Sequence, residues 1–260
     1  EFHKAIELFS AEVGGLASSL RDITEEQLAA NPAFKTALDE FLELARKAIN
    51  PKIEMADMRE MIIQHLLTED IFMRVFDEAE FHRDNVIARK LQEVASTFYK
   101  REVKHNILAR IAPYYETINA KASQISDHHE KQKFLKALYE KFYRAYNPKA
   151  ADRLGIIYTP DEIVRFMIES ADYLTFQHFG KTLGDKGVEI LDPATGTGTF
   201  ITELIEYLPN AQLPYKYKHE IHCNEVAILP YYIANLNIEY TYRQKMGEYA
   251  PYENICFVDT

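Results

Sequence analysis

The sequence predicts an all-α region followed by an α/β region with three parallel strands. Through residues 1–150, apolar side chains recur every three or four positions, which is the spacing of amphipathic helices. From residue 151 to residue 260, short β-type runs alternate with helical patterns, the order expected of a parallel sheet with right-handed crossovers. A composition of 47% hydrophobic and 27% charged residues is that of a globular chain. We therefore expect two domains, 1–150 and 151–260.

The helical region carries several signals for helix starts. Thr24–Gln27 (TEEQ) has the pattern of a capping box, which predicts a helix start there. Pro32 suits the first turn of the next helix, Pro51 ends that helix, and Thr68 is expected to cap another. The helix after Pro32 carries an apolar stripe made of Phe34, Leu38, Phe41, Leu42, Ala45 and Ile49. Further helices are predicted over 86–111, 113–125 and 127–146.

The α/β region begins with a predicted helix. Thr159 is expected as its N-cap, with Pro160 in the first helical position and Glu162 closing a second capping box. Three short runs are then predicted as strands, namely VEILD (188–192), EIHCNE (220–225) and NICFVDT (254–260). Ligands of such parallel sheets bind at the carboxyl ends of the strands, so we look for a site there.

Charge and composition restrict the class of protein. The net charge of −10 argues against nucleic-acid binding through the whole surface. Residues 151–260 hold 8 basic and 16 acidic residues, whereas 1–150 hold 22 and 24. Two basic stretches, 83–110 and 131–149, are either DNA contacts or solvated helix faces. The two cysteines suggest a reducing cytoplasm, and no apolar run approaches the roughly 20 residues that cross a bilayer, so no membrane partner is expected.

The stretch ILDPATGTGTF (190–200) predicts a strand, a glycine turn and a helix start near Thr199. No lysine follows Gly198, which argues against a phosphate-binding P-loop. Ile201 stands where a dinucleotide fingerprint has its third glycine. The turn therefore favours a ligand that approaches the backbone and places a carboxylate at the helix start.

An acidic residue closes each of the three predicted strands. Asp192 is placed to attract an ammonium group, Glu225 to accept hydrogen bonds from two ribose hydroxyls, and Asp259 to accept one from an adenine amino group. A ligand with an amino-acid end and a nucleoside end suits this set.

A zinc site is the alternative interpretation of the second strand. His219, His222 and Cys223 are zinc-binding residue types, but no fourth ligand lies at a suitable spacing. We therefore expect no metal.

These motifs resemble a known family. YTPDEIV (158–164) followed by LDPATGTGTF resembles the adenine-N6 DNA methyltransferases, which bind S-adenosyl-L-methionine on a Rossmann-like fold and place the cofactor motifs before the catalytic one. LGIIYTPDEIVRFMI, LYEKFYRAY and MIIQHLLTEDIF are similar to the large single-chain type ISP restriction-modification enzymes. In these, a nuclease and a helicase-like motor are joined through a helical coupler to a methyltransferase and a target-recognition domain. The resemblance implies that 1–150 is coupler-like and that 151–260 is the cofactor-binding part of the methyltransferase.

The resemblance also assigns residues. It implies that S-adenosyl-L-methionine contacts Tyr158, Thr159, Pro160, Asp192, Pro193, Ala194, Gly196, Gly198, Phe200, Glu225 and Asp259. The family's catalytic signature, Asn/Asp-Pro-Pro-Tyr/Phe, does not occur in these 260 residues. Because the signature belongs downstream and the chain starts at Glu1, we expect a fragment that is inactive alone, with no catalytic residue of its own.

Two hypotheses follow. In the first, the chain supplies the cofactor site of a DNA adenine methyltransferase, and double-stranded DNA is a partner of the full-length enzyme. In the second, it is a non-catalytic helical linker between a DNA translocase or nuclease and a modification domain, and the glycine turn is kept mainly for folding.

Overall fold

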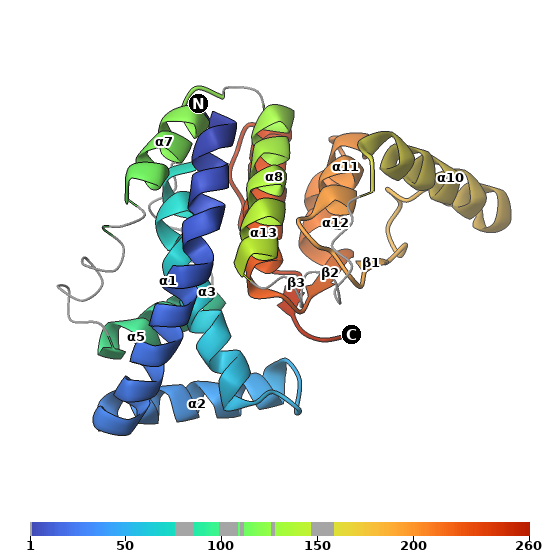
Figure 1. Cartoon of the computed structure of the whole chain (residues 1–260). Coiled ribbons are helices and arrows are strands. Elements are labelled where there is room, and N and C mark those ends of the chain that lie inside the picture. Colours follow the sequence, from blue (N-terminus) through green and yellow to red (C-terminus); the bar gives the residue numbers. More distant parts are fainter. Residues whose placement is uncertain (1, 76–85, 99–108, 110–111, 126–127, 147–158) are drawn as a thin grey trace. The chain divides into compact units, whose positions relative to one another are not determined.

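The chain forms two compact units, residues 1–156 and 157–260, in a computed structural model (Figure 1). The structure describes residues 2–75, 86–98, 109, 112–125, 128–146 and 159–260. No helix within these ranges is both long and apolar enough to cross a membrane.

The first unit is helical, as predicted. Helix α1 is its centre and contacts α2, α3, α7 and α8 (Figure 1). The described helices are α1 (Phe2–Ala30), α2 (Pro32–Ala48), α3 (Met55–Val75), α5 (Val86–Phe98), α7 (Ala112–Ala122) and α8 (His128–Tyr146). The basic stretches 83–110 and 131–149 lie partly outside the described residues.

Helix α2 matches its prediction. Pro32 is in the first turn, and the Asn31 side chain accepts a hydrogen bond of 3.2 Å from the Phe34 amide, which satisfies a free N–H at the helix start. The predicted stripe is buried throughout, from Phe34 to Ile49. Periodicity and capping agree here, so the local prediction holds.

Two predicted helix starts in this unit are wrong. Helices α1 and α3 run without a break through Thr24 and Thr68. Both threonines are buried, and each hydroxyl donates to a carbonyl four residues earlier, Leu20 at 2.6 Å and Gln64 at 2.8 Å. A threonine that bonds back within its own helix and a threonine that caps a new one look alike in sequence, and burial decides between them.

A cluster around Glu60 joins three helices of this unit. Arg21 of α1 donates two hydrogen bonds of 2.8 Å to the Glu60 carboxylate of α3, and the Tyr146 hydroxyl of α8 donates a third at 2.6 Å. Burial opposes ionisation of Glu60, but the hydrogen bonds from Arg21 and Tyr146 outweigh it and hold the pKa of Glu60 below its usual value. The last turn of α8 is therefore fixed to α1 and α3.

The second unit is built on a three-stranded parallel sheet, as predicted, in the order β1-β2-β3. Ile190 pairs with Ile221, and Cys223 pairs with Ile255. Its elements are α10 (Asp161–Phe179), β1 (Ile190–Asp192), α11 (Thr199–Tyr207), α12 (Leu213–His219), β2 (Ile221–Glu225), α13 (Ile228–Met246) and β3 (Ile255–Phe257).

Only one face of this sheet is buried by the described residues. Ile221, Cys223 and Phe257 alternate onto the face that α13 covers, and all three are buried. Leu191 and Cys256 alternate onto the opposite face and are exposed. Parallel sheets are normally covered on both faces, so this unit has a second face on which further structure can pack.

The capping box predicted at Thr159 is wrong. Helix α10 begins at Asp161, Pro160 is its N-cap residue, and no described side chain caps it. Pro160 has an extended ψ of 142°, so it stands just outside the helix although its φ of −57° suits one. The helix is joined to α11 by Arg165, whose Nε donates to Glu203 at 2.6 Å.

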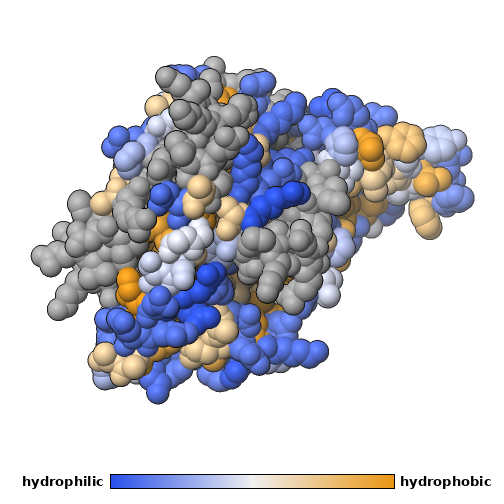
Figure 2. Space-filling model, in the orientation of Figure 1, coloured by the Kyte–Doolittle hydropathy of each residue, from blue (hydrophilic) through white to orange (hydrophobic). Residues whose placement is uncertain are grey.

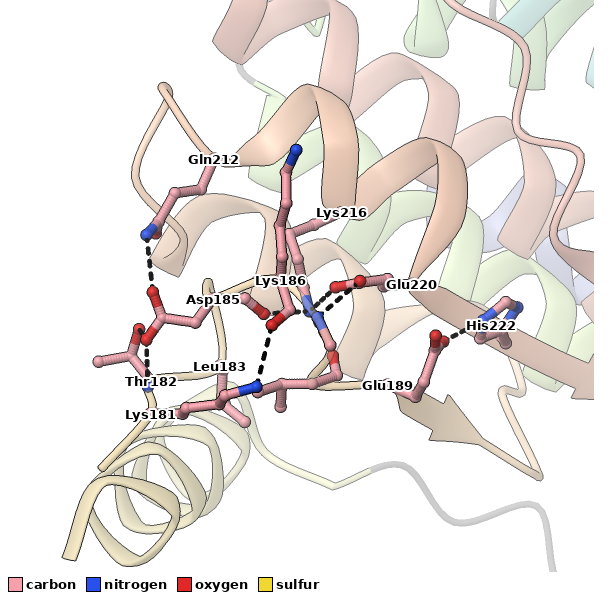
Figure 3. A network of polar contacts seen from close by, with 12 residues as sticks. Lys181, Thr182, Leu183, Asp185, Lys186, Glu189, Gln212, Lys216, Glu220 and His222 are labelled. Atoms are coloured by element: carbon pink, nitrogen blue, oxygen red, sulfur yellow. Dashed lines mark hydrogen bonds and ion pairs between the residues drawn. The ribbon is translucent and has the colours of Figure 1, made fainter. Parts of the chain in front are cut away.

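A buried lysine holds the segment that leads into β1 (Figure 3). The Lys216 Nζ of α12 is fully buried and donates to Glu220 Oε2 at 2.8 Å, to the Asp185 carbonyl at 3.3 Å and to the Val188 carbonyl. Glu220 Oε1 in turn accepts the Gly187 amide at 2.7 Å. One ammonium group and one carboxylate thus satisfy several backbone groups ahead of the strand and fix its approach.

Helix α10 exposes a stripe of large apolar side chains. Orange and pale-orange atoms lie over this part of the unit in Figure 2. The stripe follows one side of the helix and consists of Ile163, Phe166, Met167, Tyr173 and Leu174. Contiguous exposed apolar surface of this kind marks an interaction face.

Replacing Lys216 with Met is expected to destabilise the second unit by about 3–5 kcal/mol, because Glu220 keeps a buried charge without its cation. Urea unfolding of the chain measures this. Lys218→Met is the matched control on the same helix: Lys218 is exposed, and the change should stay within about 0.5 kcal/mol. Equal effects of the two substitutions would contradict the role given to Lys216.

The α10 stripe is expected to bind an apolar dye such as anilinonaphthalene sulfonate. Replacing Phe166, Tyr173 and Leu174 together with Ser should lower the dye fluorescence, since the exposed apolar area shrinks. Glu169→Ser, on the same helix, should leave it unchanged. Undiminished fluorescence in the triple variant would mean that the stripe is covered in solution.

Candidate functional site

The turn between β1 and α11 has the conformation that its glycines permit. Strand β1 ends at Asp192 and α11 begins at Thr199, as predicted. Gly196 and Gly198 have φ values of +58° and +89°, which side chains other than glycine rarely adopt. A Cβ at Gly198 would also lie 3.2 Å from the Ala234 Cα of α13. Glycine at 198 therefore allows both the turn and the close packing of α13.

Hydrogen bonds from several elements hold this turn. The Thr195 amide donates to the Asn224 carbonyl of β2 at 3.0 Å, and the Gly196 amide donates to Glu225 Oε2 at 2.8 Å. The Thr260 hydroxyl donates to the Pro193 carbonyl at 2.8 Å. The path of residues 193–198 is thus set by the chain itself.

Asp192 keeps one carboxylate oxygen without a partner. Its Oδ1 accepts the Ala194 amide at 3.2 Å, whereas its Oδ2 is buried and has no hydrogen-bond partner among the described residues. Burial raises the pKa of Asp192 above its usual value. A buried acceptor without a donor is unfavourable, so Asp192 has the chemistry of a group that receives a donor from a ligand.

Glu225 links the turn to the next helix. Its Oε2 accepts the Gly196 amide, and its Oε1 accepts the Ala227 amide at 2.7 Å, directly ahead of α13. The side chain is buried, and burial raises its pKa although these backbone bonds act in the opposite direction. From sequence we assigned Glu225 only to a ribose; its link to Gly196 was missed, because nothing in a sequence relates positions 29 residues apart.

The carboxyl ends of the three strands meet at one edge. The Val258 amide donates to the Glu225 carbonyl at 3.0 Å, which places the chain after β3 beside the end of β2. Asp259 follows Val258 and is exposed. The tertiary structure therefore brings Asp192, Glu225 and Asp259 to the same edge of the sheet.

Three further residues predicted to contact the cofactor come directly before α10. Thr159 is half-buried and Pro160 is exposed at the start of α10. Within the described part of the chain, no hydrogen bond joins either of them to the glycine turn. Tyr158 lies outside the described residues.

A groove of about 320 Å³ runs along β1 between α10 and α11, a size at the lower end of small-molecule sites. Asp192, Pro193 and Phe200 of the predicted set line it; Gly196, Gly198, Glu225 and Asp259 do not. Asp192 is the only charged residue in its described lining, which otherwise consists of Met167, Ile168, Ala171, Leu183, Ile190, Leu191, Ile201 and Leu204. The groove thus includes the part of the predicted cofactor site that is formed by Asp192, Pro193 and Phe200.

The zinc-type residues of α12 and β2 are not brought together as a set of ligands within the described part of the chain. His222 Nε2 lies 2.8 Å from Glu189 Oε2, and Cys223 is buried on the opposite face of the strand. The His219 ring packs against Tyr215. The described ranges contain no group of three or more His, Cys, Asp or Glu side chains arranged to hold a metal ion.

Comparison with known proteins identifies two regions. Residues 6–130 match the coupler domain of type ISP restriction-modification enzymes, and residues 130–241 match the N-6 DNA methylase family. No curated protein sequence matches the chain.

Three solved structures resemble nearly the whole chain. A DrdV–DNA complex solved by cryo-electron microscopy is 59% identical over 99% of this chain, with a TM-score of 0.89. The ATP-dependent type ISP enzyme LlaBIII bound to DNA is 32% identical over 98%, with a TM-score of 0.86. A nuclease-deletion mutant of the type ISP enzyme LlaGI, in complex with a DNA substrate mimic, is 31% identical over 96%, with a TM-score of 0.81.

The chain is much shorter than these proteins. It spans 25% of the DrdV chain, 18% of the LlaBIII chain and 21% of the LlaGI chain. The two family matches and the three structural matches agree along the sequence. The chain therefore belongs to the type ISP restriction-modification enzymes and carries a coupler domain followed by an N-6 DNA methylase domain.

Proposed function

We propose that this chain supplies the S-adenosyl-L-methionine site of a cytoplasmic adenine-N6 DNA methyltransferase that is part of a longer restriction-modification enzyme. The observation that carries the proposal is Asp192, whose buried Oδ2 has no partner among the residues that the structure describes and lies beside a preformed glycine turn. Glu225 and Asp259 at the same edge of the sheet support it.

Each group has a role in this proposal. Asp192 Oδ2 accepts hydrogen bonds from the ammonium group of the cofactor, and the start of α11 receives its carboxylate. Glu225 keeps its two backbone bonds and accepts the ribose hydroxyls with its remaining lone pairs, since each carboxylate oxygen takes about two hydrogen bonds. Asp259 accepts the adenine amino group. Pro193, Ala194, Gly196, Gly198 and Phe200 shape the loop, and Tyr158, Thr159 and Pro160 are assigned to the methionine end.

The chemistry then depends on positioning. When bound, S-adenosyl-L-methionine supplies an electrophilic methyl group. The residues of this chain hold its amino-acid and nucleoside ends, which fixes the direction in which that methyl group points. The target adenine leaves the DNA stack before its exocyclic nitrogen can be reached. The catalytic Asn/Asp-Pro-Pro-Tyr/Phe signature is assigned to a part of the longer enzyme outside these 260 residues, so the chain alone should not methylate DNA.

The rest of the longer enzyme supplies the other partners. We assign residues 1–150 to the coupler and 151–260 to the cofactor-binding part of the methyltransferase. Double-stranded DNA is contacted by the full-length enzyme, as the DNA complexes of the similar enzymes suggest. Nuclease, helicase and target-recognition domains are expected in the same polypeptide.

A second function is a helical linker without cofactor binding. The observation in its favour is that the glycine turn is held by the chain's own hydrogen bonds, so it needs no ligand to keep its shape. Deleting residues 1–150 from the longer enzyme separates the hypotheses. Normal DNA methylation after this deletion would contradict a coupling role for the helices.

Isothermal titration calorimetry of the 260-residue chain with S-adenosyl-L-methionine tests the cofactor site. Asp192→Ala should weaken binding by about 10–100-fold, because a hydrogen bond to a charged group contributes about 1.5–3 kcal/mol. Glu206→Gln, an exposed acidic residue on α11, is the control and should bind as the unchanged chain does. The proposal fails if neither this chain nor the full-length enzyme binds the cofactor.

The affinity should also depend on pH. Burial raises the pKa of Asp192, and an ammonium partner would lower it, so binding requires the ionised carboxylate. Affinity is therefore complete above the raised pKa and falls as the pH drops through it, at a higher pH than for an ordinary aspartate. Asp192→Asn should bind weakly with a flatter pH profile. An identical pH dependence in both proteins would exclude Asp192 as the titrating group.

A further inference from the structure

Helix α13 is buried without interruption from Ile228 to Glu239 and contains polar side chains within that stretch. Asn237 is one of them, with 4% of its surface exposed. Its Nδ2 donates a 3.0 Å hydrogen bond to the carbonyl of Thr197, which lies 40 residues earlier in the glycine turn. A helix that packs over the turn thus also binds it with a side chain.

The hydrogen bonding of Asn237 is incomplete. Its Oδ1 is buried and has no hydrogen-bond partner among the described residues. The orientation of the amide follows from its partner, since only the NH₂ group can donate to a carbonyl. A buried amide that leaves its oxygen unsatisfied is an inefficient way to stabilise a fold. We therefore look for a role of the Asn237–Thr197 hydrogen bond other than stabilising the fold.

The bond fixes one peptide group of the turn. The Thr197 carbonyl and the Gly198 amide belong to the same peptide plane. Asn237 binds the carbonyl, and the Thr195 carbonyl accepts the Gly198 amide at 2.9 Å. The residue after this plane is Gly198, whose φ is +89°, and because glycine adopts positive and negative φ almost equally well, a rotation of the peptide has little steric cost on that side. With both its ends bound, the plane cannot turn over.

We propose that Asn237 is a positioning residue for the cofactor turn: by binding Thr197 it holds the Thr197–Gly198 peptide in the orientation that presents the first amides of α11 to the carboxylate end of the ligand. The proposal rests on the proposed function, because the ligand is S-adenosyl-L-methionine. A purely structural Asn237 would contribute to the stability of the unit and leave the affinity of the folded protein unchanged.

The variants are Asn237→Leu, which keeps a similar volume without the donor, and Lys245→Met as the matched control. Lys245 is also on α13, and its Nζ donates to the carbonyls of Ile205, Glu206 and Leu208 at the end of α11. Both substitutions remove side-chain donors to backbone carbonyls, but only Asn237 contacts the turn. All measurements are made well below the melting temperature of each variant.

The first measurement needs no ligand. Hydrogen exchange of the 260-residue chain should be at least about tenfold faster at the amides of residues 196–200 in Asn237→Leu, while exchange in β2 stays as in the unchanged chain. Lys245→Met should leave residues 196–200 unchanged. Equal protection of these amides in Asn237→Leu and the unchanged chain would overturn the proposal, whatever the binding result.

The second measurement compares S-adenosyl-L-methionine with adenosine, which lacks the amino-acid end. Asn237→Leu should weaken the first by at least about tenfold and leave the second unchanged, and Lys245→Met should alter neither. Equal losses for both ligands, or no loss, would overturn the positioning role. If neither the unchanged 260-residue chain nor the full-length enzyme binds S-adenosyl-L-methionine, the proposed function fails, and the cofactor role of Asn237 fails with it. The hydrogen-exchange result still decides whether Asn237 holds the turn.

Discussion

The Glu225 carboxylate is the interaction on which the candidate site depends. It receives the Gly196 amide from the turn after β1 and the Ala227 amide from the start of α13, so it joins the turn, the end of β2 and the start of α13 at one point. Because this carboxylate is buried, its two backbone donors are needed to offset the loss of water. The turn, the edge of the sheet and the helix above it are therefore held as one piece.

Two other polar clusters likewise hold segments of the chain in place. Lys216 and Glu220 hold the segment that enters β1, and Glu60 holds the last turn of α8 against α1 and α3. Buried charges of this kind are seldom a large net source of stability, since their desolvation cancels much of the attraction. We infer that in this chain they specify where an element begins or ends. The first cluster lies at the passage from α12 to β2, and the second lies at the last turn of α8.

The order of the elements could be predicted from sequence, because apolar periodicity extends over many residues and averages out local exceptions. The three strands and the start of α11 at Thr199 follow it. Capping signals were less informative. Thr24 and Thr159 were predicted to begin capping boxes and Thr68 to cap a helix, yet Thr24 and Thr68 lie inside helices and Thr159 does not cap α10. A capping pattern spans four residues, and the burial that decides its outcome comes from other elements.

By itself, the sequence determined the two regions of the chain, the glycine turn and Asp192 as a candidate ligand-binding residue, because these features depend on neighbours along the chain. Only the tertiary structure decided that Asp192 Oδ2 is buried with no partner in the described part of the chain, that Glu225 closes the turn and that Asn237 binds Thr197. Those contacts join residues 29 and 40 positions apart. They exist because parallel strands bring their carboxyl ends to one edge and the crossover helix packs back over it.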